Sequence, residues 1–171
     1  FFFFFYEQQH AVQPRRVFFP SLLTYTPTAG QKPVYDFYKS QEGPFDKTNN
    51  AGAGTVKSDY LFKNGSRLTL RYNRSGSEET NAVTVGGAIE AFTQSALSNE
   101  GTEQDKVHFG SAQYTAVIRP TLVNDFKFSG SYEERPRLAN SDKPGLVAST
   151  IGTLGTRNFL PTVQQDKRWQ F

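Results

Sequence analysis

The 171 residues include 19 basic and 16 acidic side chains, and the two signs are interspersed along the chain. This mixed pattern argues against a dedicated nucleic-acid surface. The chain has no cysteine, which excludes disulfides and thiolate metal sites, and no apolar run approaches the roughly 18 residues of a membrane helix. Methionine is also absent, so we expect the chain to be an excerpt from a longer protein.

Aromatic residues carry an unusual share of the apolar content. The chain contains 16 Phe and 8 Tyr, and Gly, Ser, Thr and Asn separate the aromatic segments. These polar and small residues lower the helix propensity, whereas aromatic residues favour strands. The composition therefore favours an all-β protein.

The chain begins with FFFFFYEQQHAV, residues 1–12, which predicts a first strand. Successive strand side chains point to opposite faces, so a run of phenylalanines places rings on both faces. The run itself leaves open whether Phe1, Phe3 and Phe5 face outward or whether Phe2 and Phe4 do.

Residues 55–74 have the pattern of a β-hairpin. In both limbs, charged or polar residues alternate with apolar and aromatic ones, with Ser58 and Leu61 as the exceptions in the first limb. Asn64-Gly65 lies between the limbs and favours the positive φ angles of a tight turn. We expect strands at residues 55–63 and 66–74.

A second hairpin follows at residues 106–134, with the same alternation in its limbs at 106–118 and 121–134. Arg119-Pro120 separates the limbs, because proline interrupts the ladder of backbone hydrogen bonds and favours a short reversal. A last strand is predicted from residue 165 onward.

The connections between these strands alternate between long and short. The long ones, at residues 13–54, 75–105 and 135–164, are rich in Gly, Pro, Ser, Thr and Asn. In an up-and-down meander, this order places the short turns at one end and the long loops at the other, as in outer-membrane barrels. The predicted strands also reach the length of about 9 to 11 residues that crosses a bilayer. We predict an antiparallel up-and-down meander of about six strands, part of a transmembrane outer-membrane β-barrel.

The alternation separates a charged face from an aromatic face. We expect the charged residues to face the lumen, where they could contact a substrate or a plug: Lys57, Asp59, Arg67, Arg71, Asp125, Lys127 and Glu133. We expect the aromatic and apolar residues to face lipid: Tyr60, Phe62, Leu70, Tyr72, Phe126, Phe128 and Tyr132. Two alternatives stay open. The charges could simply be solvated by a wet interior, and the aromatic face could be the core face of a soluble sheet.

Four segments resemble the barrel region of Oar-like TonB-dependent receptors. They read FFFFFYE, SDYLFKNGSRLTLRYNRSG, SAQYTAVIRPTLVNDFKFSGSYEERPRLAN and LGTRNFLPTVQQDKRWQF. The most specific parts are RLTLRYNRS and PTLVND, where PTLVNDFKF departs conservatively from the PTLVNEFR type of the family. These are strand signatures, so the resemblance implies architecture more firmly than substrate.

The resemblance implies a large outer-membrane barrel with an N-terminal plug, energised by the TonB complex of the inner membrane. The sequence contains neither a plug domain nor a segment for TonB contact, so these partners are implied by the resemblance alone. The expected partners are outer-membrane lipid, the TonB complex through that plug, and an unidentified ligand outside the cell. The expected role is transport of a substrate across the outer membrane.

Signals for catalysis are weak. AGAGTVKS lacks the Gly-Lys-Ser/Thr ending of a phosphate-binding loop, and we interpret it as a flexible loop end. Adjacent carboxylates such as Glu133 and Glu134 point to opposite faces of a strand, so they cannot form a catalytic pair. His10 and His108 stand without ligand spacing. We predict no enzyme activity, no cofactor and no metal site.

Two rival interpretations stay open from sequence alone. One is a soluble, secreted all-β module for binding or adhesion, and the other is a filament or surface-layer subunit. An incomplete barrel would leave its first and last strands with unpaired edges, so we expect the chain alone to aggregate.

Overall fold

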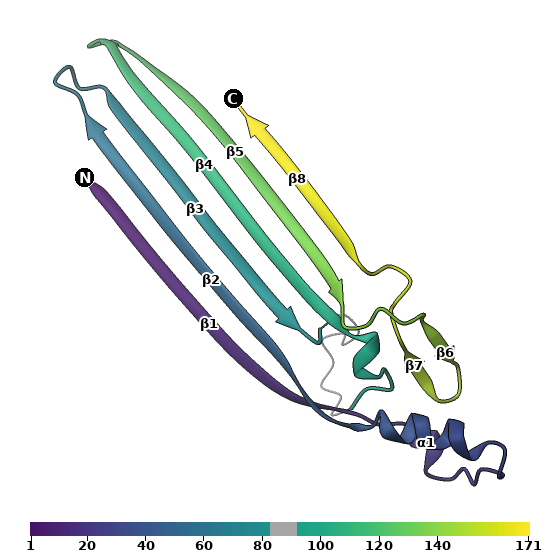
Figure 1. Cartoon of the computed structure of the whole chain (residues 1–171). Coiled ribbons are helices and arrows are strands. Elements are labelled where there is room, and N and C mark those ends of the chain that lie inside the picture. The colour runs from purple at the N-terminus through teal and green to yellow at the C-terminus, as the bar shows by residue number, and fades with distance from the viewer. Residues whose placement is uncertain (83–91) are drawn as a thin grey trace.

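The computed structural model describes residues 1–82 and 92–171 and contains one large antiparallel sheet (Figure 1). Six strands follow one another in chain order across the sheet, which is an up-and-down meander: β1 (Phe2–Val17), β2 (Gly43–Leu61), β3 (Arg67–Thr80), β4 (Gly101–Arg119), β5 (Leu122–Ala139) and β8 (Thr162–Gln170). Among the described residues, β1 and β8 each pair on one side only, so the sheet is open.

Both short turns lie at one end of the sheet, and the long connections lie at the other (Figure 1). The turn between β4 and β5 contains Pro120, as the sequence predicts, and a register shift between Val117 and Arg119 accompanies it. The one-ended arrangement of the connections is therefore confirmed.

The turn between β2 and β3 differs in type from the expected two-residue turn. Gly65 has a φ of 85°, but Asn64 does not have a positive φ. The Gly65 N–H donates to the Phe62 carbonyl at 3.0 Å, and the Phe62 N–H donates to the Ser66 carbonyl at 2.8 Å. This is the longer hairpin in which only the last loop residue is left-handed, a conformation that glycine adopts without strain.

The strands extend further toward the long connections than the sequence predicts. Residues 43–54 belong to β2, although the alternation places them in a connection, and AGAGTVKS is therefore strand rather than a flexible loop end. β1, β3, β4, β5 and β8 are extended in the same way. The glycines lack strand propensity of their own. Continuous pairing with β1 on one side and β3 on the other holds them in the ladder.

The three long connections pack together at one end of the sheet (Figure 1). They contain η1 (Pro20–Leu22), α1 (Lys32–Ser40), η2 (Leu97–Asn99) and the hairpin of β6 (Leu146–Ala148) and β7 (Gly152–Leu154). We call these packed connections the cap. No helix in the described part of the chain is long and apolar enough to cross a bilayer.

The buried hydrophobic cluster of the described residues lies in and beside the cap rather than on the sheet faces. Its members come from β1 and all three long connections: Val17, Phe19, Leu22, Tyr38, Ala96 and Leu154. The sequence does not predict this core, because each connection contributes only a few apolar residues without periodicity.

Candidate functional site

The strand register gathers the predicted charged residues on one face of the sheet. Directly paired residues of antiparallel strands project from the same face. Lys57 pairs with Arg71, Arg67 pairs with Thr115, and Thr115 pairs with Asp125, which links β2 to β5. We call this surface the polar face, and it carries all seven predicted residues: Lys57, Asp59, Arg67, Arg71, Asp125, Lys127 and Glu133.

Asp59 is the most enclosed carboxylate among the predicted polar-face residues, with 9% of its side chain exposed. Thr69 Oγ1 donates to Asp59 Oδ1 at 2.5 Å. The Arg67 guanidinium lies 2.9 Å from the same oxygen, and Lys57 Nζ lies 3.0 Å from Oδ2. One carboxylate therefore joins two cations from adjacent strands.

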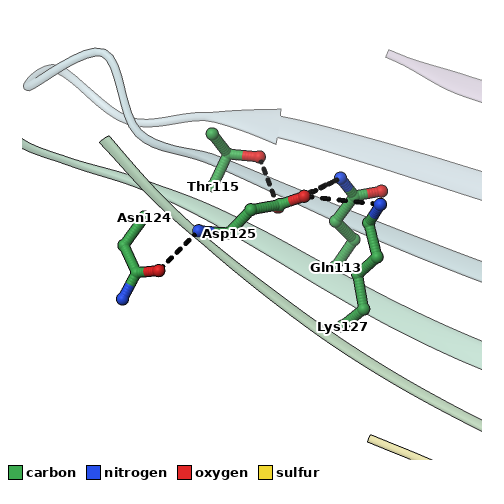
Figure 2. Close-up of polar contacts among 5 residues, drawn as sticks. All are labelled: Gln113, Thr115, Asn124, Asp125 and Lys127. Atoms are coloured by element: carbon green, nitrogen blue, oxygen red, sulfur yellow. Dashed lines mark hydrogen bonds and ion pairs between the residues drawn. The ribbon is translucent and has the colours of Figure 1, made fainter. Parts of the chain in front are cut away.

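Asp125 has a similar but more open environment near the β4–β5 turn, shown in Figure 2. Gln113 Nε2 donates to both carboxylate oxygens, at 3.1 and 3.0 Å. Thr115 Oγ1 donates to Oδ1 at 3.0 Å, and Lys127 Nζ lies 3.5 Å from Oδ2. The Asp125 N–H donates to Asn124 Oδ1, which fixes the start of β5 beside the turn.

A hollow of about 340 Å³ lies between these two carboxylates on the polar face. Its lining comes from β2, β3 and β4: Lys57, Arg67, Thr69, Arg71, Ser111, Gln113 and Thr115. Asp59 pairs with Lys57 and Arg67 but offsets only one positive charge, and Arg71 forms no ion pair with any described residue. The hollow therefore keeps a positive charge and suits an anionic group.

The uncharged members of the hollow are not among the residues predicted to face the lumen. Thr69, Gln113 and Thr115 lie on the polar face by the same alternation that places the charges there, so the signal was present. Glu133, in contrast, belongs to a separate group closer to the cap, where Arg135 pairs with it and Asp166 lies opposite it on β8. In the described ranges, His, Asp and Glu side chains form no group of three or more that suits a metal ion.

The opposite face gathers the predicted aromatic residues, and we call it the aromatic face. Its predicted members are Tyr60, Phe62, Leu70, Tyr72, Phe126, Phe128 and Tyr132, and the register brings six of them onto one face. The seventh, Phe62, follows the end of β2, and its ring packs edge-on against Tyr60 and Tyr114 on that face. Phe2 pairs with Ser58 and Phe4 with Val56, so these two phenylalanines share the aromatic face.

The aromatic face has no protein layer against it among the described residues. Phe4 is 64% exposed, Tyr60 61% and Phe126 58%. A soluble sheet of this size would bury such a face against a second layer. A continuous exposed apolar surface of this extent instead marks contact with a partner or a membrane.

The family model of the outer membrane beta barrel domain matches residues 18–168, which is most of the chain. The chain belongs to the outer membrane beta barrel domain family. No curated protein and no solved structure matches the chain. The membership confirms the predicted fold class and the predicted location in the outer membrane. It concerns the barrel and not a particular receptor type.

The aromatic face of this outer-membrane barrel domain is apolar only in the half of the sheet near the short turns. Tyr72 and Tyr132 lie toward the cap side of this apolar band, and Tyr60 and Tyr114 lie toward the turns. Tyrosine rings prefer the interfaces of a bilayer, where the ring is buried and the hydroxyl is solvated. Beyond Tyr132 the same face becomes polar, with Lys106 paired to Glu134 at 3.7 Å.

The cap is ordered by backbone and side-chain hydrogen bonds between its connections. The Phe18 N–H donates to the Thr93 carbonyl at 3.0 Å, and the Ala96 N–H donates to the Thr153 carbonyl at 2.9 Å. The buried Asn99 amide donates to the Gly155 carbonyl at 2.8 Å. These bonds join all three connections into one body at the end of the barrel wall.

Glu42 ties the end of α1 to the start of the first connection. Its carboxylate accepts a hydrogen bond from the Phe19 N–H at 2.9 Å and lies 2.6 Å from Lys39 Nζ. Burial opposes ionisation of Glu42, but the hydrogen bonds from Lys39 and Phe19 outweigh it and hold the pKa of Glu42 below its ordinary value. The ionised carboxylate therefore stabilises the cap.

Proposed function

We propose that this chain forms part of the barrel wall of a TonB-dependent, Oar-like receptor that moves a substrate across the outer membrane. In this proposal, the aromatic face contacts lipid, and the polar face lines the lumen. The cap lies outside the cell, because outer-membrane barrels carry their long loops on that side. A plug domain, which the chain does not contain, would connect the barrel to the TonB complex.

The observation that carries the membrane-facing part of this proposal is the exposure of the aromatic face. Phe126 and Phe128 are exposed on β5, while their strand neighbours Asp125 and Lys127 form ion pairs and hydrogen bonds on the other face. A single sheet with these two faces is stable when hydrocarbon covers the aromatic face and water solvates the polar face.

The receptor type rests on the sequence resemblance, and the hollow of the polar face offers it a physical role. Lys57, Arg67 and Arg71 present cations there, and Asp59 compensates only part of that charge. An acidic segment of a plug, or an anionic group of a passing solute, would complete the hollow. In this role the cationic side chains of the hollow bind the anionic group and hold it in position.

Photocrosslinking in the whole protein tests whether a plug fills the lumen. A benzoylphenylalanine residue placed at Arg71 should crosslink to another segment of the same polypeptide, which peptide mapping would identify. The matched control is the same residue at Phe126, which lies on the opposite face and should crosslink only to lipid.

Two outcomes would contradict the proposal in different ways. Protein crosslinks from position 126 with none from position 71 would reverse the assignment of the two faces. If position 71 forms no crosslink to another segment of the same polypeptide, the barrel has no plug, and the TonB-dependent assignment is contradicted.

A further inference from the structure

The aromatic face contains a groove whose lining is almost entirely apolar. The groove has a volume of about 930 Å³, within the range of cavities that hold small-molecule ligands. Its apolar lining comes from β2, β3, β4, β5 and β8 and includes Val56, Leu70, Tyr72, Gly110, Ala112, Phe128 and Trp169.

The middle of the groove is open at Gly110. A Cβ atom added to Gly110 would meet nothing within 4 Å, whereas one added to Gly130 would lie 2.4 Å from the Trp169 ring. The indole therefore covers Gly130 and forms one wall, and Phe128 stacks against the indole with ring centroids 5.9 Å apart. Gly110 is left as an open floor of a size that suits a flexible hydrocarbon chain.

Cationic and hydrogen-bonding groups lie at the cap side of the groove. The register places Arg74, His108, Tyr132 and Lys167 side by side in one row across β3, β4, β5 and β8. Lys167 and His108 line the groove. Lys167 Nζ lies over the Tyr132 ring at 5.6 Å, and neither Lys167 nor Arg74 forms an ion pair with any residue in the described ranges.

The acidic groups near this row are already engaged. Tyr132 donates to Glu134 at 2.6 Å, and Lys106 lies 3.7 Å from the same carboxylate. Glu78 accepts a hydrogen bond from Gln104 at 2.6 Å, one step further toward the cap. The row itself therefore keeps two positive charges at the level where the apolar band ends.

The two cations are three strand spacings apart, which is about 14 Å at the usual distance between strands. A disaccharide that carries a phosphate at each end spans a similar distance. A lipid with an anionic headgroup and acyl chains fits this arrangement, because the cations lie on the cap side and the apolar groove lies on the side of the short turns.

We infer that this surface binds the bisphosphorylated lipid A part of lipopolysaccharide, with one acyl chain in the groove and the phosphates on Arg74 and Lys167. The inference rests on the proposed function through the outward orientation of the aromatic face and the extracellular position of the cap. The cap side of a barrel is the extracellular side, so the row lies at the headgroups of the outer leaflet.

Native mass spectrometry of the whole protein in detergent tests the groove, with bisphosphorylated lipid A as the probe. Gly110→Leu fills the open floor and should weaken lipid A binding about tenfold or more, since several methylene groups lose their site. The matched control is Ala116→Leu, on the same face of the same strand but outside the groove. This variant should bind as the unaltered protein does.

The headgroup contacts are tested by variants that leave the apolar packing intact. Arg74→Gln and Lys167→Gln should each weaken lipid A binding about fivefold. Lys106→Gln, one row further toward the cap and paired with Glu134, serves as the charge control and should change binding little. Monophosphorylated lipid A should bind more weakly than the bisphosphorylated form, and phosphatidylethanolamine more weakly still.

Equal lipid A binding by Gly110→Leu and Ala116→Leu would overturn the groove assignment. Equal binding of phosphatidylglycerol and lipid A would overturn the choice of ligand. Trp169 is the only tryptophan of the chain, and its orientation is tested separately by quenching with brominated acyl chains, measured against Trp169→Phe. Absence of quenching would contradict the proposed function itself, whereas quenching without selective lipid A binding would overturn only this inference.

Discussion

The half of the sheet near the short turns and the cap at its other end bury apolar residues in opposite ways. On the sheet, Phe126 and Phe128 are exposed on one face, where the proposed function places the lipid of the outer membrane. In the cap, Phe19 and Leu154 are buried against other parts of the chain. Within the described residues, apolar side chains therefore form a buried core in the cap, whereas those on the aromatic face of the sheet stay exposed.

The polar groups follow the same division. Near the turns, the partners of Asp59 and Asp125 all lie on the polar face. The aromatic face carries no charged residue between the rows of Tyr60 and Tyr72. Closer to the cap, polar pairs occur on both faces. Thr48 and Thr80 are hydrogen bonded at 2.6 Å on one face, and Lys47 lies 3.3 Å from Glu79 on the other. The predictions below test this division, from the largest expected effect to the smallest.

Removing the centre of the cap core should have the largest effect. Phe19 is fully buried, so Phe19→Ala should lower the stability of the cap by about 3 to 5 kcal/mol. Hydrogen exchange should become faster in residues 93–99 and 146–154 and stay unchanged near the short turns. Phe37→Ala, at an exposed position of α1, is the control and should have a small effect. Equal loss of protection throughout the sheet would show that the cap and the wall are one cooperative unit.

A charge in the middle of the aromatic face should have the next largest effect. Phe128→Arg should lower barrel stability by about 2 to 4 kcal/mol, because the guanidinium would lie in hydrocarbon. Ser129→Arg is the matched control on the same strand, because Ser129 pairs with Ser111 on the polar face. Folding into lipid vesicles, followed by the gel shift of unheated samples, measures both. Similar stability of the two variants would contradict the assignment of the faces.

The two carboxylates of the polar face should differ in importance. Asp59→Asn leaves Lys57 and Arg67 uncompensated in an enclosed setting, whereas Asp125→Asn leaves one exposed lysine. We expect the first variant to lower stability more than the second, and both to lower it less than Phe128→Arg. Unfolding at low and high salt should show the gap shrinking as salt rises, since screening weakens exposed ion pairs. A larger effect for Asp125→Asn would show that enclosure does not decide the strength of these sites.

The cap should show a small acid sensitivity that depends on Glu42. The pKa of Glu42 is lower in the folded protein than its ordinary value of 4.5. Its stabilising contribution is therefore fully present above that value and is lost as the pH falls through the lowered folded pKa. Glu42→Gln should remove this dependence from hydrogen exchange of the cap. If the cap of Glu42→Gln opens in acid to the same extent as the cap of the unaltered protein, the assignment to Glu42 is contradicted.

The sequence predicts the half of the sheet near the short turns well, because both of its faces leave a local signal in the alternation of residues. Period-two alternation assigns Leu70 and Tyr72 to one face and Arg71 to the other, and the register confirms it. The cap core has no such signal. Val17, Ala96 and Leu154 meet across connections that are distant in sequence, so only the folded chain brings them together.

The extended strands were missed for a different reason. Ala51-Gly52-Ala53-Gly54 has low strand propensity and no alternation of charge, yet each residue pairs on both sides within the sheet. Neighbouring strands decide the structure there. The Asn64-Gly65 turn was correctly located, but its type depended on the conformation of a single residue, Gly65.

The length of β2 has a mechanical consequence. The strand has 19 residues, and about 9 to 11 are enough to cross the hydrocarbon. The remainder, about 8 residues, rises about 25 Å along the strand direction. Because this part of β2 is hydrogen bonded to its neighbours on both sides, it is stiff. A force applied to the cap is therefore transmitted to the rest of the sheet through paired strands and not through a flexible linker.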